Sequence, residues 1–126
     1  MTGDSPYFVD WLEIAKKDWK RMNIMLKEGD IDAAGYFLQQ SLEKHLKAYN
    51  LKNGGKLKKL HELDALLDET IKFNPELSSF YPLCERVSSY FMTLRYPTLT
   101  EEKLEYKDIR ADIIEAEKLV FALFPY

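Results

Sequence analysis

The sequence predicts an all-α protein, an up-and-down helical bundle of four long helices plus one short helix. Apolar residues recur at three- and four-residue spacing along most of the chain, and Gly and Pro residues separate these stretches at helix-length intervals. No segment alternates apolar and polar residues for long enough to form a strand. The 126 residues contain no repeat or linker, so we expect residues 1–126 to form a single domain.

The first predicted helix begins at Ser5-Pro6, where serine can cap the helix and proline suits its first position. The helix ends at Gly29. Its apolar stripe consists of Phe8, Trp11, Leu12, Ala15, Trp19, Met22 and Leu26.

The second predicted helix is capped by Asp30 and ends before Gly54-Gly55. Its apolar stripe consists of Ile31, Ala34, Leu38, Leu42, His45, Leu46 and Tyr49. The opposite side carries Gln40, Glu43, Lys44 and Lys47, but also Ala33, Tyr36 and Leu51. Because that side is not purely polar, we expect both sides of this helix to be covered. The second cover could be another helix, a second subunit or a ligand.

Three further helices complete the predicted bundle. A short helix carries Leu63, Leu66, Leu67 and Ile71, and Asn74-Pro75 then breaks the chain. The fourth helix carries Phe80, Leu83, Cys84, Val87, Phe91 and Leu94, tolerates Pro82 only in its first turn and ends near Arg95. After a loop, the last helix runs from about Tyr106 to Phe124, with Ile109, Ile113, Ala116, Val120 and Leu123 facing inward.

The charge distribution excludes a generally basic nucleic-acid-coating protein, since the net charge is −3. Residues 43–59 nevertheless contain six lysines and one acid, which leaves a net charge of −8 for the rest of the chain. Such an island favours a compact anion or an acidic partner over long duplex DNA, although lysines that only keep a loop in solution give the same pattern. The lone Cys84 and the absence of a signal sequence or an apolar run that could span a membrane predict a cytoplasmic protein.

Few residues have the spacing that a metal site, a phosphate-binding loop or a catalytic site requires. Two histidines separated by fifteen residues and one distant cysteine predict no metal site, and no phosphate-binding Gly motif surrounds Gly54-Gly55, which is expected to end a helix. His45 lies on an apolar stripe and is expected to be a core or interface residue. His61 either packs or caps the short helix, or it contacts a phosphate or acts in acid–base catalysis.

Arg95 and Tyr96 stand at the end of the fourth helix, immediately before Pro97. Arg95 either complements the helix dipole or grips a phosphate, and Tyr96 could stack on a base. Tyr90, Tyr96 and Tyr106 could serve bundle packing or base stacking. The carboxylates of Glu101, Glu102 and Glu105 are expected to be solvated.

Several short patterns, in this order and at these spacings, resemble the HEPN domain, the nucleotide-binding domain of higher eukaryotes and prokaryotes. They are the N-terminal pattern Trp11, Leu12, Ala15, Asp18 and Trp19, the core Gln40, Glu43, Lys44, Leu46 and Lys47, the step His61 and Leu63, and Arg95-Tyr96-Pro97. The resemblance covers essentially the whole chain. It implies a helical bundle, usually a homodimer, often encoded beside a small nucleotidyltransferase as a toxin–antitoxin-like pair.

The resemblance also implies a possible activity, because many members are metal-independent ribonucleases with an Arg-x(4–6)-His motif. The arginines here stand at positions 21, 86, 95 and 110, and none has a histidine five to seven positions later. We therefore expect a cofactor-free module that binds a nucleotide or RNA phosphate through Gln40, Glu43, Lys44, Lys47, His61, Arg95 and Tyr96. Two alternatives are a ribonuclease toxin with a rearranged site, in which Arg95 and His61 are the catalytic candidates, and a purely structural oligomerisation partner.

Overall fold

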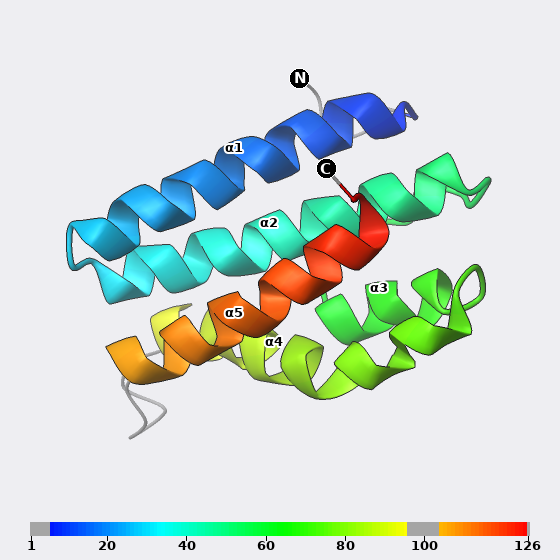
Figure 1. Cartoon of the computed structure of the whole chain (residues 1–126). Coiled ribbons are helices and arrows are strands. Elements are labelled where there is room, and N and C mark those ends of the chain that lie inside the picture. Colours follow the sequence, from blue (N-terminus) through cyan, green and yellow to red (C-terminus); the bar gives the residue numbers. More distant parts are fainter. Residues whose placement is uncertain (1–5, 96–103, 126) are drawn as a thin grey trace.

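The structure is an all-α bundle, as predicted, in which the four long helices alternate in direction (Figure 1). The computed structural model describes residues 6–95 and 104–125, and within them the side chains of residues 6–90 and 104–125. The helices are α1 (Phe8–Lys27), α2 (Ile31–Lys52), α3 (Leu63–Thr70), the 3-10 helix η1 (Pro75–Phe80), α4 (Tyr81–Arg95) and α5 (Tyr106–Leu123). No strand occurs in the described ranges. None of their helices combines the length and the apolar character needed to span a bilayer.

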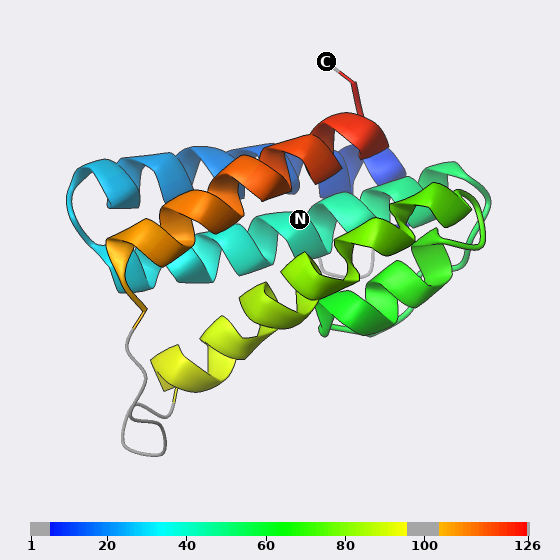
Figure 2. The same cartoon turned by 60° about the horizontal axis from the view of Figure 1, so that its bottom comes forward.

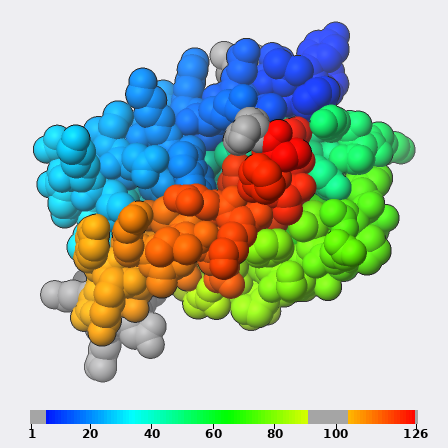
Figure 3. Space-filling model, viewed as in Figure 1, coloured from blue at the N-terminus to red at the C-terminus, as the bar shows by residue number. Residues whose placement is uncertain are grey.

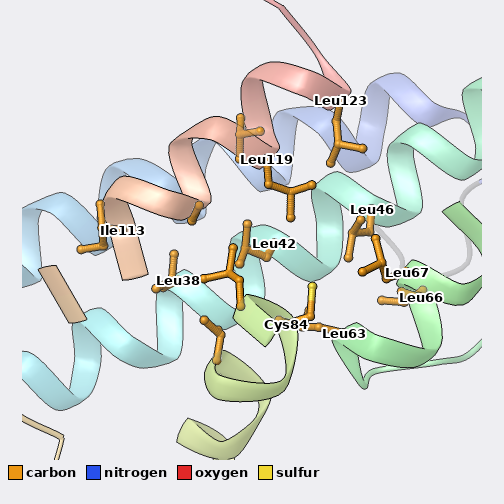
Figure 4. Packing of buried hydrophobic residues seen from close by; sticks show 14 of the residues in the cluster. Leu38, Leu42, Leu46, Leu63, Leu66, Leu67, Cys84, Ile113, Leu119 and Leu123 are labelled. Carbon is orange, nitrogen blue, oxygen red and sulfur yellow. The ribbon is translucent and has the colours of Figure 1, made fainter. Parts of the chain in front are cut away.

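Helix α2 lies in the middle of the bundle and packs against α1, α3, α4 and α5 (Figures 1 and 2). Its stripe of Leu38, Leu42 and Leu46 has no exposed surface. In the core these side chains lie among residues of the surrounding helices, including Leu119 of α5 and Cys84 of α4 (Figure 4). Burial of such side chains is the main source of stability for a bundle of this size. Cys84 is fully buried, as expected for a small core residue.

Two glycines end the first two helices, as predicted. Gly29 follows α1 with a φ of 82°, and Gly54 follows α2 with a φ of 89°, conformations that a side chain disfavours. Between them, an oxygen of the Asp30 side chain accepts a hydrogen bond from the Ala33 backbone N–H at 3.0 Å and caps α2. The resulting α1–α2 hairpin is therefore closed by a short turn with satisfied helix ends.

The predicted start of the first helix is wrong by two residues. Pro6 lies before the helix, the N-cap is Tyr7 in an extended conformation, and α1 begins at Phe8. The first turn is closed by a hydrogen bond from the Asp10 backbone N–H to the Tyr7 carbonyl at 3.2 Å, so the chain becomes helical where the apolar stripe begins. Ser5, the predicted cap, lies outside the described residues.

The break at Asn74-Pro75 contains a 3-10 helix that the sequence pattern did not predict. The Asn74 side chain accepts a hydrogen bond from the Glu76 backbone N–H at 3.3 Å, and Pro75 occupies the start of η1. Pro82 lies in the first turn of α4, as expected. The predicted inward side chains of Phe91 and Leu94, and the predicted loop up to residue 103, lie outside the described part.

Gly35 allows the segment before α5 to approach α2 closely. A Cβ atom at this position would lie 2.7 Å from Cδ2 of Leu104 and 3.4 Å from Cδ2 of Tyr90. The missing side chain therefore makes room for both residues against the α2 backbone, and it explains a glycine in the interior of a long helix despite its cost of roughly 1 kcal/mol.

A pair of isoleucines tests the assignment of the core. Ile113 of α5 is fully buried, whereas Ile24 of α1 is 45% exposed. We expect Ile113→Ala to lower the free energy of unfolding by about 2–5 kcal/mol, because the substitution leaves a cavity. The matched change Ile24→Ala should cost less than about 1 kcal/mol. Urea denaturation measures both, and equal losses would contradict the inward orientation of α5.

Candidate functional site

A buried carboxylate in the middle of α2 is surrounded by three basic side chains. Glu43 is 1% exposed. Its Oε2 lies 2.5 Å from Lys44 Nζ and 3.7 Å from Lys47 Nζ, and its Oε1 lies 3.3 Å from His61 Nδ1. Both carboxylate oxygens are thus engaged, as the cost of burying an ionised group requires.

Trp11 of α1 covers the two lysines. The ammonium groups of Lys44 and Lys47 lie 5.5 Å and 5.1 Å from the centre of a Trp11 ring. An indole face attracts cations at this distance. Trp11 is itself buried, so α1 covers the polar side of α2 at Lys44 and Lys47. There, the cover that the sequence left undetermined is another helix of the same chain, whereas Tyr36 on the same side of α2 is 48% exposed.

The segment between α2 and α3 places His61 at this cluster. It runs back along α2, and the Gln39 side-chain amide donates a hydrogen bond to the His61 carbonyl at 3.2 Å. The Gln40 amide in turn donates to Gln39 Oε1 at 2.8 Å. This chain of amides holds the backbone of the segment against α2, and it gives Gln40 a supporting role at the site.

The cluster carries excess positive charge, because two ammonium groups share one carboxylate. Burial lowers the pKa of Lys47, and the neighbouring Glu43 carboxylate opposes that shift. Only 5% of the Lys47 side chain is exposed, against 17% for Lys44 and 76% for His61. A ligand at the surface would therefore meet His61 and the tip of Lys44, while Lys47 supplies charge from below.

A comparison with protein-family models identifies the chain. The model of the HEPN domain matches residues 8–121, which is nearly the full length. The chain belongs to the HEPN domain family. No curated protein and no solved structure matches it significantly. The match confirms the resemblance predicted from the sequence, and it places the chain in a family of nucleotide-binding and ribonuclease-like modules.

The structure of this HEPN domain brings five of the seven predicted site residues together: Gln40, Glu43, Lys44, Lys47 and His61. Arg95 is the last residue of α4, and its side chain lies outside the described part, as does the whole of Tyr96. The Leu63 backbone N–H donates to Ser88 Oγ at 3.3 Å, which marks where α4 passes the start of α3. Seven residues further on, Arg95 lies about 10 Å along the helix from that point.

The lysine island of residues 43–59 is divided among several contacts. Lys52 lies over the rings of Phe8 and Phe124, and Lys58 forms an ion pair with Glu69 at 2.6 Å. These lysines tie the end of α2 and the following segment to their neighbours. Only part of the positive charge of the island, that of Lys44 and Lys47, therefore lies at Glu43.

Sequence reasoning missed a second polar cluster, between α4 and α5. Asp112 of α5 is 6% exposed and accepts hydrogen bonds from the Tyr90 hydroxyl and from Arg86 Nε, the latter at 3.0 Å. Arg86 also pairs with Glu115. Burial, followed by the Asp112 carboxylate, raises the pKa of Tyr90 far above its ordinary value. Asp112 occupies an inward position of the α5 stripe. A carboxylate at such a position predicts that a hydrogen-bonding or basic partner is buried with it, and this was the signal that sequence reasoning could have used.

Tyr90 and His45 serve packing in this HEPN domain. Tyr90 is 6% exposed, which decides between packing and base stacking for this tyrosine. His45 is 1% exposed, as expected for a core residue, and its Nδ1 lies 2.9 Å from the Ser41 carbonyl oxygen. The Ser41 hydroxyl donates to the Ala15 carbonyl at 2.8 Å and links α2 to α1. Across the described ranges, no three His, Cys, Asp or Glu side chains gather as metal ligands would.

Removal of the central carboxylate tests the cluster. Glu43→Gln keeps the shape but leaves the buried Lys47 ammonium without its counter-charge, so we expect a loss of about 3 kcal/mol in the free energy of unfolding. Adding Lys47→Met should recover part of that loss, because the unpaired charge disappears. Denaturation of both variants and of the exposed control Glu13→Gln measures the effect. Equal effects of Glu43→Gln and Glu13→Gln would show that the cluster contributes nothing.

The buried imidazole predicts a pH dependence of stability. Burial lowers the pKa of His45 from 6.5 to about 4, so the unfolded chain binds the proton more tightly. The His45 contribution is fully present above about pH 6.5 and is lost as the pH falls toward 4, to a total of roughly 3 kcal/mol. The fall in unfolding free energy from pH 7 to pH 5 should therefore be about 2 kcal/mol smaller in His45→Gln than in the wild type. Parallel pH profiles would contradict this assignment.

Proposed function

We propose that this HEPN domain is a dimeric module that binds phosphate groups of a nucleotide or RNA at the surface formed by Lys44 and His61. The observation that carries the proposal is the pairing of one buried carboxylate with two ammonium groups, which leaves net positive charge beneath a surface formed by these two residues. A lysine ammonium binds phosphate as a point charge, and an exposed imidazole can donate a hydrogen bond to it.

Each residue of the cluster has a distinct part in this proposal. His61 and Lys44 contact the phosphate, while Glu43 fixes the direction of Lys44. Lys47 is buried, so it acts as a positioning residue that contributes charge at a distance. Contacts of Arg95 and Tyr96 with the phosphate stay predictions, because the Arg95 side chain and the whole of Tyr96 lie outside the described part.

Binding is favoured over cleavage as the function. The sequence has no Arg-x(4–6)-His motif, and within one subunit α4 carries Arg95 away from the point where it passes α3. A ribonuclease with a rearranged site would need Arg95 and His61 on one substrate phosphate. The proposal further includes a small nucleotidyltransferase as the partner in a toxin–antitoxin-like pair and a cytoplasmic location. HEPN domains commonly dimerise, which supports the dimeric form.

A titration with labelled single-stranded RNA, with ATP as competitor, tests the proposal by fluorescence anisotropy. We expect binding that weakens with salt, because phosphate contacts release counterions. Lys44→Ala and His61→Ala should each weaken binding about tenfold, and Lys20→Ala, a change at an exposed position of α1, should not. Circular dichroism confirms that the variants are folded.

The outcomes separate the three functions. No binding of RNA or ATP at low salt would contradict the proposal and favour a purely structural partner. Cleavage of the RNA that disappears in both Arg95→Ala and His61→Ala would instead identify a ribonuclease.

A further inference from the structure

The aromatic ring of Tyr36 lies on the polar side of α2 and is open to solvent. Tyr36, Gln40, Glu43 and Lys47 are spaced i, i+4, i+7 and i+11, which places them within an arc of about 60° around the helix. Glu43 and Lys47 are buried, Gln40 is partly buried and Tyr36 is 48% exposed. The cover of this side of α2 therefore ends between Gln40 and Tyr36.

The path of the chain explains why the cover ends there. Trp11 of α1 lies over Lys44 and Lys47. The segment before α3 runs along α2 only as far as His61, whose carbonyl oxygen accepts the hydrogen bond from Gln39. The chain then enters α3 and leaves the earlier turns of α2 without this cover.

The Tyr36 ring is oriented by its neighbour Phe37. The two ring centres lie 5.3 Å apart, with an angle of 72° between the planes, which is an edge-to-face contact. Phe37 is partly buried and packs against the core, so it anchors the exposed ring. An exposed aromatic ring in a fixed orientation is a platform on which a nucleic-acid base can stack.

The distance between this ring and the basic surface suits a strand. Lys44 follows Tyr36 by eight residues, so about 12 Å along the helix axis separate the two positions. A stacked strand advances about 3.4 Å per nucleotide, and an extended strand advances more. The distance therefore corresponds to about two or three nucleotides, so a phosphate at Lys44 and a base at Tyr36 belong to different nucleotides of one strand.

On the other side of His61 the surface is acidic. A hollow of about 550 Å³ beside α3 and α4 is lined by His61 and by the carboxylates of Glu62, Asp64 and Glu85. None of these three carboxylates forms an ion pair with another described residue. Their charge repels the phosphates of a strand that leaves the basic surface in that direction.

The direction along α2 carries less negative charge. Asp18, on the buried side of α1, pairs with Arg21 at 2.9 Å. Glu105, the N-cap of α5, pairs with Lys107 at 3.5 Å. The exposed Asp32 lies one turn beyond the tyrosine ring, at the far end of the surface. The charges therefore direct a bound strand along α2 toward the ring.

We propose that Tyr36 stacks on a base of a single-stranded RNA whose phosphate lies at Lys44 and His61, with the strand running along α2 over Gln40. This inference rests on the proposed function, because it takes the phosphate contacts from there and names the single strand as the ligand. Tyr36 acts as a specificity-determining residue, since it distinguishes a strand with accessible bases from a phosphate alone. Paired RNA does not fit the site, because its bases are stacked on one another inside the helix.

Removal of the ring tests the stacking contact. In Tyr36→Ala we expect the dissociation constant for labelled oligouridine, measured by fluorescence anisotropy, to rise about tenfold, whereas Tyr36→Phe keeps the ring and should bind like the wild type. The control is Phe121→Ala, which removes another exposed ring, 61% exposed, from α5 and should have no effect. Helix α5 lies across the face of the molecule shown in Figure 3 and packs on the core side of α2. Circular dichroism confirms that the variants are folded.

A strand without bases separates stacking from phosphate binding. An abasic strand of the same length keeps every phosphate, so the wild type should bind it about tenfold more weakly than oligouridine, while Tyr36→Ala should bind both strands alike. The salt dependence should be unchanged in Tyr36→Ala, whereas Lys44→Ala should lower its slope by about 0.7. Uridine monophosphate should compete only weakly, because one nucleotide does not reach both ends of the surface.

The outcomes distinguish this inference from the proposed function. Oligouridine binding that depends on Lys44 but not on Tyr36, or equal binding of both strands by the wild type, would overturn the stacking contact and leave phosphate binding intact. A loss in Asp64→Asn without a loss in Tyr36→Ala would place the base in the acidic hollow and overturn it as well. A Tyr36→Ala variant that also loses the abasic strand would show a purely structural role. No binding of any strand at low salt would contradict both proposals.

Discussion

The ionised carboxylate of Glu43 determines how the polar side of α2 is built. An ionised carboxylate removed from water needs several charged or hydrogen-bonded partners, and here they come from its own helix and from the segment before α3. Lys44 and Lys47 contact one oxygen of the Glu43 carboxylate and lie against Trp11, and His61 contacts the other oxygen. Helix α1 through Trp11, the segment before α3 through His61, and the basic surface through Lys44 all meet at this one ion cluster.

The helices were predictable because their signals are local. Each signal depends on only a few neighbouring residues: the spacing of the apolar stripe, the cap at Asp30, and the helix ends at Gly29 and Gly54. The structure contains each of them. The start of α1 was misplaced because both Pro6 and Phe8 suit a first turn. Helix η1 was missed because a short 3-10 segment has no apolar period to reveal it.

The site was predictable only in part, for a different reason. Gln40, Glu43, Lys44 and Lys47 stand out because they occur together on one helix, whereas their burial depends on Trp11, about 30 residues earlier. No spacing rule connects these positions. The Arg86–Tyr90–Asp112 cluster likewise joins residues from two helices, and only the inward position of Asp112 hinted at it. Contacts between distant segments are decided by packing, which a single sequence does not display.

The two surfaces of this HEPN domain belong to different parts of the chain. Every residue of the Glu43 cluster lies between Trp11 and His61, within the α1–α2 hairpin and the segment that follows it. The exposed side chains of Ile114 and Phe121 on α5 come from the last quarter of the sequence and share no residue with that cluster. Sequence changes on the outer face of α5 can therefore accumulate without altering the residues that hold the basic surface, so the two surfaces can diverge independently among relatives.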